Sequence, residues 1–103
     1  MNNRFFLQQA IEKCCIVRFR YKSETHFREA APYTIFEATT DKILVYAIQI
    51  LDESKLMQGE VPRDYEIELM RDIVVKKDKF VPDRSYTPSR LKICRRVIFS
   101  IHA

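Results

Sequence analysis

The sequence predicts a mainly β protein, a small barrel of about five antiparallel strands with one N-terminal α-helix and a C-terminal extension. Its 103 residues, of which 47% are hydrophobic, suffice for one globular domain. Hydrophobic residues recur first at helical spacing near the N-terminus, and several segments that alternate with polar residues follow. We therefore expect a barrel domain over residues 1–90 and an extension over residues 91–103.

A helix is predicted at the N-terminus, followed at once by a strand. Asn2 or Asn3 can cap this helix. Its apolar stripe consists of Leu7, Ala10, Ile11 and Cys14. From Cys15 the period changes to two, which predicts a half-buried strand with a basic outer face. In this strand Val17, Phe19 and Tyr21 alternate with Arg18, Arg20 and Lys22.

Four further strands are predicted before the extension. Residues 27–36 form a strand that bends near Pro32, because proline cannot donate to a central ladder. Residues 43–50 are apolar on both sides, so this strand should be the most buried. Residues 65–69 alternate as a fourth strand, and a fifth starts at residues 73–75.

The C-terminal extension fits two structures. Alternating apolar residues between Leu91 and Ile101 fit a strand, whereas Leu91, Cys94 and Ile98 fit a helix. The β-branched content favours the strand. An uncovered apolar edge invites pairing, so this segment either closes the barrel or adds to the sheet of a second copy as a dimer arm.

Charge is unevenly distributed around the formal net value of +4. Residues 52–75 carry seven acidic and three basic side chains, whereas residues 76–103 carry eight basic and two acidic ones. This asymmetry favours an anionic partner or a second copy of the chain. The sequence contains no membrane span and no secretory signal, and its three cysteines imply no disulfide framework. We therefore expect a cytoplasmic protein.

Five short motifs follow one another in an order known from one family. Residues 10–13 (Ala-Ile-Glu-Lys), 17–21 (Val-Arg-Phe-Arg-Tyr) and 28–32 (Arg-Glu-Ala-Ala-Pro) come first. Residues 43–47 (Ile-Leu-Val-Tyr-Ala) and 63–68 (Arg-Asp-Tyr-Glu-Ile-Glu) follow. This order resembles that of WYL domains, which open with a helix, a strand ending in Tyr and an Arg-x-hydrophobic-x-Pro step. The triplet Trp-Tyr-Leu that names the family is degenerate here, because it falls on Ile-Leu-Val.

The resemblance implies an Sm-like small β-barrel. WYL domains commonly serve as the sensing half of bacterial transcription regulators and are thought to bind nucleic acid or nucleotide-like ligands through basic and aromatic positions. Only residues 1–6 precede the similar region, which leaves no room for a helix-turn-helix domain. We therefore expect a standalone module that acts through a separate partner protein.

A cluster of arginines and tyrosines forms the predicted ligand site. Clustered guanidinium groups hold phosphates bidentately, and tyrosine rings stack on bases. The predicted site consists of Arg18, Arg20, Arg28, Tyr33, Tyr46 and Arg63. A second interpretation is a solvated basic strand face that pairs across the sheet with glutamates, while the tyrosines pack in the core. The glutamates concerned are Glu29, Glu66 and Glu68.

A second basic cluster lies near the C-terminus. It consists of Arg84, Arg90, Lys92, Arg95 and Arg96. Together with Tyr86, it could follow a nucleic-acid backbone, with binding that weakens as salt rises. A flexible basic tail, or a subunit contact with the acidic residues 52–72 of a neighbour, explains the same pattern.

Catalytic and metal-binding motifs are missing from the sequence. Its three cysteines and two histidines have no zinc-ligand spacing, and there is no glycine-rich phosphate loop or nucleophile elbow. Glu66 and Glu68 are explained as an outer strand face. We therefore predict no catalytic residues, no metal and no cofactor.

The leading hypothesis is a non-enzymatic regulatory binding module for single-stranded nucleic acid or a nucleotide-like anion. The alternative is a protein-interaction or oligomerisation module without a small ligand. Under either hypothesis a partner protein or a homodimer is expected, and a membrane is not.

Overall fold

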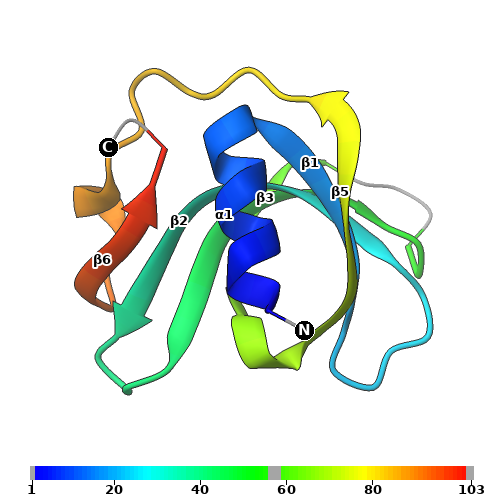
Figure 1. Ribbon diagram of the computed structural model, residues 1–103, viewed down its shortest axis with the longest axis horizontal. Helices are drawn as coiled ribbons and strands as arrows, with labels where there is room; N and C mark the ends of the chain where they lie inside the picture. Colours follow the sequence, from blue (N-terminus) through cyan, green and yellow to red (C-terminus); the bar gives the residue numbers. More distant parts are fainter. Residues whose placement is uncertain (1, 56–58, 102–103) are drawn as a thin grey trace.

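In the computed structural model, which describes residues 2–55 and 59–101, one α-helix precedes six strands of a single antiparallel sheet (Figure 1). The elements are α1 (Asn3–Lys13), β1 (Cys15–Tyr21), β2 (Arg28–Ala38), β3 (Ile43–Asp52), β4 (Val61–Glu66), η1 (Ile67–Leu69), β5 (Met70–Lys79), η2 (Pro88–Arg90) and β6 (Cys94–Ser100). The prediction of a mainly β protein with an N-terminal helix is therefore confirmed for the described residues.

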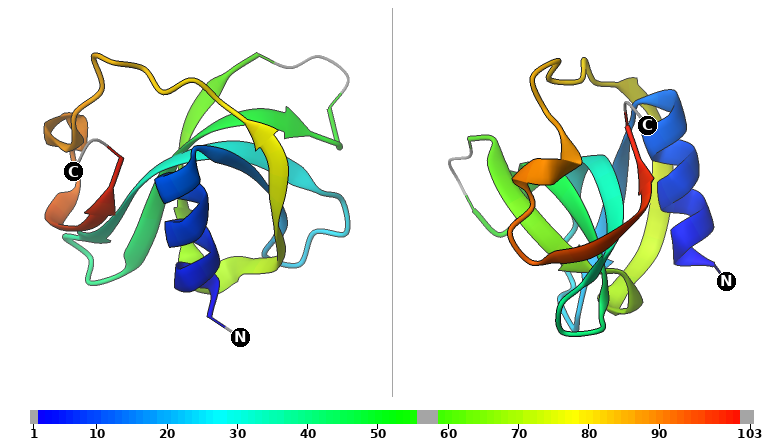
Figure 2. Two further views of the ribbon diagram at one scale, coloured as in Figure 1. Left: turned by 45° about the horizontal axis from the view of Figure 1, so that its top comes forward. Right: turned by 90° about the vertical axis from the view of Figure 1, so that its left-hand side faces the viewer.

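The strands are ordered β4-β3-β2-β1-β5, and β6 pairs with β2 outside this path. Along one of its edges β2 has two neighbours in turn. Residues 28–30 pair with β1, and residues 34–38 pair with β6. Pro32 lies between the two paired segments, where a missing N–H costs least. β4 and β5 stand at the two ends of the order and form no ladder with each other, so the sheet is bent but not closed (Figure 2).

Individual hydrogen bonds hold the turn between β4 and β5 against the rest of the molecule. The side-chain amide of Asn3 donates to the carbonyls of Ile67 (3.1 Å) and Met70 (2.8 Å). The backbone N–H of Glu66 donates to the hydroxyl of Tyr21 at 2.9 Å. These bonds attach the start of α1 and the end of β1 to the turn that joins β4 to β5.

The helix forms where the sequence predicts it. Asn2 is the N-cap and accepts a hydrogen bond from the backbone of Phe5 at 3.2 Å. Leu7, Ala10 and Ile11 are buried, and α1 lies against β1, β2 and β5. Cys14 is half-buried against the same core and ends the helix as its C-cap, in the left-handed conformation with φ 56°.

The fourth predicted strand is displaced. β4 ends at Glu66, and a 3₁₀ turn follows where residues 67–69 were expected to continue the strand. The reason is the length of β3, which begins at Ile43 and pairs through Leu44 with Glu66, so little of β3 remains for a longer partner. The fifth strand is longer than predicted and covers Met70–Lys79.

The most buried strand is β2, and the prediction for residues 43–50 is wrong on this point. Every residue from 30 to 36 in β2 is buried, whereas buried and half-buried residues are mixed along β3. β2 has β1, β3 and β6 as neighbours and lies in the middle of the sheet. β3 also has a neighbour along each edge, but one of them is the largely exposed end strand β4, so β3 is covered less well than β2.

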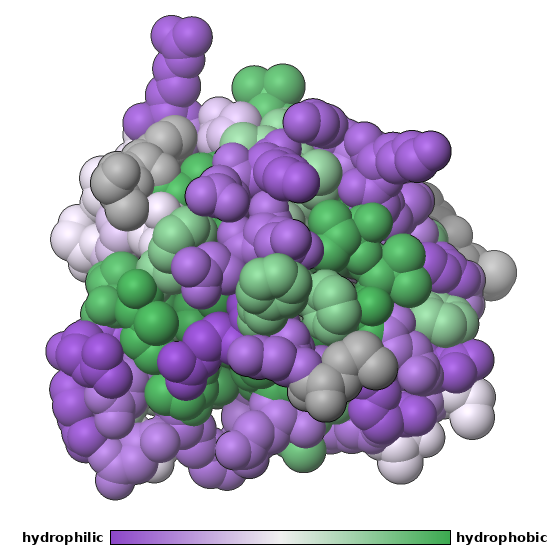
Figure 3. All heavy atoms as spheres, viewed as in Figure 1, coloured by the Kyte–Doolittle hydropathy of each residue, from purple (hydrophilic) through white to green (hydrophobic). Residues whose placement is uncertain are grey.

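The C-terminal segment is a strand in this chain. β6 runs antiparallel to β2, with Thr34 opposite Ser100 and Ile35 opposite Phe99. The part of the chain that the structure describes has no helix long and apolar enough to cross a membrane. On the face that carries α1, hydrophobic side chains form separate patches between hydrophilic ones (Figure 3).

Candidate functional site

The predicted ligand-site arginines lie on two faces of the sheet. In the ladder between β1 and β2, Arg18 is opposite Glu29 and Phe19 is opposite Arg28. Opposite residues share a face and neighbours along a strand alternate, so Arg28 lies on the core face with Phe19, whereas Arg18 lies on the outer face. The structure brings Arg18 and Arg20 together and separates Arg28 from them.

Arg18 and Arg20 meet over one aromatic ring. Their guanidinium carbons lie 4.2 and 4.3 Å from the ring centroid of Phe27. Arg18 contacts Glu29 at 3.0 Å and Glu53 at 2.7 Å, and the hydrogen bond with Glu53 raises the pKa of Arg18. Arg20 contacts Asp72 at 3.1 Å. Both guanidinium groups therefore already have carboxylate partners.

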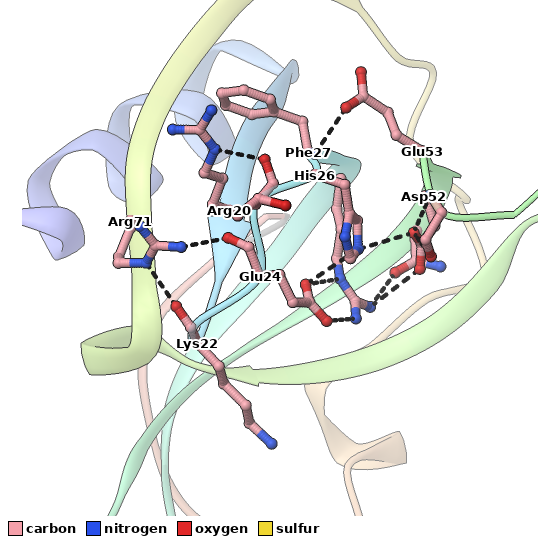
Figure 4. A network of polar contacts seen from close by, with 12 residues as sticks. Arg20, Lys22, Glu24, His26, Phe27, Asp52, Glu53 and Arg71 are labelled. Carbon is pink, nitrogen blue, oxygen red and sulfur yellow. Dashed lines mark hydrogen bonds and ion pairs between the residues drawn. The ribbon is translucent and has the colours of Figure 1, made fainter.

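The loop between β1 and β2 is attached to β5 by a third arginine. Arg71 donates to the backbone carbonyls of Lys22, at 2.6 Å, and of Glu24 (Figure 4). Arg20 donates to the carbonyl of Thr25, at 3.0 Å, in the same loop. These side chains hold the backbone of the loop in place.

Arg28 binds a carboxylate bidentately and lies near two tyrosine rings. Its guanidinium donates to the two oxygens of Glu24 at 3.0 and 2.7 Å and to Gln49 at 2.9 Å. Its guanidinium carbon is 5.8 Å from the ring centroid of Tyr21 and 5.9 Å from that of Tyr65. The hydrogen bonds raise the pKa of Arg28 and lower that of Glu24. This arrangement is a complete cation site filled by the protein's own arginine.

Asp52 and His26 extend the same cluster into the protein. The Nε2 atom of His26 lies 3.2 Å from Asp52 and 3.4 Å from Glu24, and it has no hydrogen-bond partner within the described chain. Burial opposes ionisation of Asp52, but hydrogen bonds from Ser54 outweigh it, so the pKa of Asp52 is lowered. This carboxylate stays charged inside the cluster.

The cluster is balanced in charge, and we call it the charge network. Its five basic members are Arg18, Arg20, Arg28, Arg71 and Lys76. Its main acidic members are Glu24, Glu29, Asp52, Glu53 and Asp72, and Lys76 also lies 3.9 Å from Asp78. Of the glutamates expected to pair with the basic face, Glu29 does so, whereas Glu66 pairs with Lys42 at 2.7 Å. The network therefore presents little uncompensated positive charge.

Arg63 lies apart from this network. It is exposed on β4, opposite Ala47 of β3, and forms no ion pair with another described residue. It stands two positions before Tyr65, whose pKa burial raises and the charges of Arg28 and Arg63 lower in part. Arg63 is thus the one member of the predicted arginine set that has no carboxylate partner in the described chain.

The second basic cluster is divided between two places. Arg95 and Arg96 pair with Glu37, and Arg95 also pairs with Asp41 beside the turn after β2. Arg90, on η2, lies 3.8 Å from Asp83. Arg84 and Lys92 form no ion pair within residues 2–55 and 59–101. The cluster therefore does not act as one continuous positive surface.

Two adjoining hollows lie between β3 and the connection that follows β5. The first, which we call the tyrosine pocket, has a volume of about 130 Å³. Its lining consists of Tyr33, Tyr46, Ile48, Glu60, Asp83, Tyr86 and Arg90. The second, which we call the apolar groove, measures about 560 Å³. Its apolar lining consists of Ile16, Ala31, Ile48, Ile50, Phe80 and Val81.

Three tyrosines are in mutual contact at the pocket. The rings of Tyr46 and Tyr86 are stacked, with centroids 5.4 Å apart and 8° between their planes, and Tyr33 meets Tyr86 edge-on at 4.8 Å. The hydroxyl of Tyr33 accepts the backbone N–H of Asp83 at 3.0 Å, and that of Tyr86 contacts Thr34 at 2.5 Å. Tyr33 and Tyr86 are buried and fixed, whereas Tyr46 is half-buried.

The rim of the two hollows is mainly acidic. Glu60 and Asp83 line both hollows, and Asp78 lines the apolar groove. Asp64 lies opposite Tyr46 in the β3–β4 ladder, and burial raises its pKa. Glu60 makes no ion pair or hydrogen bond with another residue of the described chain. Asp83 pairs with Arg90 and Asp78 with Lys76, and Lys79 also lines the groove, so Glu60 is the lining carboxylate that is open to a cation.

The predicted site included Tyr33 and Tyr46 but omitted the apolar groove. The pattern of residues 43–50 could have indicated the groove, because a strand with apolar residues on both sides requires cover on both faces. Val81 also marks the groove in the structure, since this apolar side chain lines it and is 93% exposed. The sequence offered no way to tell which of these apolar side chains line a hollow and which fill the core.

Comparisons with known proteins identify no relative. The chain matches no family model, no curated protein and no solved structure. The resemblance to WYL domains therefore stays a prediction. Within the described residues, no group of three or more His, Cys, Asp or Glu side chains is placed to hold a metal ion.

Proposed function

We propose that this protein is a non-enzymatic protein-interaction module that holds a segment of a partner in the apolar groove. One observation carries the proposal: the groove combines an apolar floor with the rim carboxylate of Glu60, which has no partner in the described chain, whereas the arginines of the charge network are paired internally. An open apolar hollow beside uncompensated charge is typical of a binding surface. Internally paired arginines are typical of a structural cross-link.

The groove indicates the chemistry of its partner. Ile48, Ile50 and Phe80 offer apolar surface, and Glu60 carries a negative charge beside it. Asp78 also lines the groove but lies 3.9 Å from Lys76, and Lys79 adds a positive charge. Apolar contacts supply affinity, and charge complementarity supplies orientation and a faster encounter. The matching partner is an extended peptide with apolar side chains and adjacent basic residues.

Binding of nucleic acid or a nucleotide remains a prediction from the sequence. A phosphate at Arg18 would have to displace Glu29 and Glu53 from contacts of 3.0 and 2.7 Å. The tyrosine pocket is no better suited to phosphate, because Glu60 repels it and the lining arginine, Arg90, already lies 3.8 Å from Asp83. The geometry therefore favours the protein-interaction module.

We also propose that the bent sheet belongs to the Sm-like small barrels. The order β4-β3-β2-β1-β5 and the short 3₁₀ turn between the two end strands support this, because both would allow the sheet to close around one core. The hydrogen bond from the backbone of Glu66 at the end of β4 to the hydroxyl of Tyr21 on β1, the strand beside β5, also supports it. The same proposal explains why α1 packs beside the opening.

The test is selection from a random peptide library, followed by fluorescence anisotropy with a labelled selected peptide. We expect selected peptides to combine apolar and basic residues. Ile48→Thr removes apolar floor and should weaken binding about threefold to tenfold. Ile93→Thr is the matched control, because Ile93 is 41% exposed and does not line the groove.

A labelled oligodeoxythymidine provides the opposing result. Tight binding that falls as salt rises, and that is lost in the double variant Arg18→Ala, Arg20→Ala, would overturn the proposal and support a nucleic-acid site. Selected peptides that bind Ile48→Thr and the parent protein equally would also overturn it.

A further inference from the structure

We propose that the tyrosine pocket takes an arginine side chain of the partner, with the guanidinium between the ring of Tyr46 and the carboxylate of Glu60. This inference rests on the proposed function and names the residue that the partner must contribute.

The pocket has room and the right walls. Its volume of about 130 Å³ far exceeds the ~10–15 Å³ that one water needs. Tyr46 is half-buried, and its hydroxyl donates to no other described residue. Aromatic faces attract cations through the ring quadrupole, and a carboxylate at the edge adds a charge-assisted hydrogen bond. The pocket thus offers both contacts to one cation.

The charge network contains the filled version of this arrangement. There Arg28 lies 5.9 Å from the ring centroid of Tyr65, while Glu24 binds its guanidinium bidentately. The tyrosine pocket repeats the ring and the carboxylate, as Tyr46 and Glu60, without a cation that joins them. Arginine fits better than lysine, because a planar guanidinium stacks on a ring and binds a carboxylate at the same time.

Arg90 shows that a guanidinium is compatible with the pocket entrance. It lines the pocket, lies 3.8 Å from Asp83 and donates to Ser85 at 3.1 Å. It does not pair with Glu60, and no stacking of it on Tyr46 is seen among the described residues. Arg90 therefore occupies one wall of the pocket. The space between Tyr46 and Glu60 stays open to a side chain of the partner.

The test uses nuclear magnetic resonance titration with N-acetyl-arginine amide. We expect saturable shifts at the ring resonances of Tyr46 and Tyr86, with a dissociation constant in the millimolar range. Glu60→Gln should weaken binding about threefold to tenfold, because a neutral amide replaces the carboxylate. Glu12→Gln is the matched control, since Glu12 is exposed on α1 and does not line the pocket.

Three results would overturn the inference: no shift at the tyrosine rings, equal affinity for N-acetyl-norleucine amide, or equal affinity of the Glu60→Gln variant. The selected peptides separate this failure from that of the proposed function. If replacing their arginines by norleucine leaves binding unchanged while Ile48→Thr weakens it, the groove proposal stands and the arginine pocket is wrong.

Discussion

The charge network and the tyrosine pocket are built from the same residue types and differ in completeness. In the network, Arg28 lies by Tyr21 and Tyr65 and binds Glu24 bidentately. In the pocket, the rings and carboxylates surround a hollow of about 130 Å³. The network joins the loop after β1 to β3 and β5. In the pocket, Glu60 makes no ion pair or hydrogen bond that links two elements of the described chain.

This difference separates structural arginines from binding residues. A guanidinium that already has its ring and its carboxylate contributes to folding, and an external ligand gains little by displacing it. A ring and a carboxylate without their cation contribute little to folding and leave that contact to a ligand. Substitutions in the network should therefore change stability, and substitutions in the pocket should change binding.

The largest expected effect is on the free energy of unfolding when a tyrosine beside the charge network is truncated, compared with a tyrosine of the pocket. Tyr65 is buried, packs against Phe19 at 5.0 Å and donates to Gln49 at 2.5 Å. Tyr65→Ala should lower the free energy of unfolding by about 3–5 kcal/mol. Tyr46→Ala, at a half-buried ring, should cost about 1–2 kcal/mol. Urea denaturation measures both, and equal losses would remove the distinction between the regions.

Arg28 should give the next largest effect. Arg28→Met keeps an unbranched apolar stem and leaves Glu24 and the buried Asp52 without the arginine's charge. We expect the free energy of unfolding at neutral pH to fall by about 2–3 kcal/mol. Arg63→Met is the control, because Arg63 is exposed and unpaired within the described chain, and it should be close to neutral. A neutral Arg28→Met would show that the network does not support the fold.

Lowering the pH should weaken the contribution of the charge network to the stability of the fold and should relieve a destabilising charge beside the tyrosine pocket. The pKa values of Glu24, Asp52 and Glu53 are lowered in the folded protein, so the unfolded chain takes up protons first as the pH falls below about 4.5. Their stabilisation is complete above that pH and is lost below it. Burial raises the pKa of Asp64, so its ionisation costs stability as the pH rises, and Asp64→Asn should remove that cost.

Urea denaturation at a series of pH values measures both contributions. Arg28→Met should flatten the loss of stability in acid, because Arg28 is the main cause of the lowered pKa of Glu24. Asp64→Asn should raise stability at neutral pH and leave it unchanged at low pH. An unaltered acid slope in Arg28→Met would contradict the role given to the network.

The sequence predicted the helix and the alternation of β1, because both depend on local spacing. It also placed Arg18 and Arg20 on one face. It could not place Arg28, because the face of Arg28 depends on the register between β1 and β2, and that register is set by the intervening loop. Glu29 was predicted as a partner of the basic face, but Glu53 and Asp72 were hidden for the same reason, since they come from distant segments.

The tyrosine pocket depends on long-range placement. Tyr86 stacks on Tyr46 only because the connection from β5 to β6 crosses beside β3. An aromatic residue in a turn-rich segment does not reveal which strand it will meet. The sequence therefore supplied two of the three tyrosines as site residues and gave no indication of the hollow between them.

A smaller effect is expected from Glu60, and it tests the pocket side of the comparison. Glu60→Gln removes a carboxylate without a described partner, so the free energy of unfolding should stay within about 0.5 kcal/mol of the parent value. Differential scanning calorimetry measures this. A clear destabilisation would show that Glu60 already has a structural role and is not reserved for a ligand.

The smallest expected effect concerns Arg90, the cation at the pocket entrance. Arg90→Ala removes a positive charge that competes with an incoming guanidinium, so the affinity for N-acetyl-arginine amide should rise about twofold. Arg84→Ala is the control, because Arg84 carries the same charge nearby in sequence and does not line the pocket. If affinity falls in Arg90→Ala, Arg90 assists binding, for example by holding Asp83 in place at 3.8 Å. The pocket would then be a site that the protein has already assembled around its own arginine, as in the charge network.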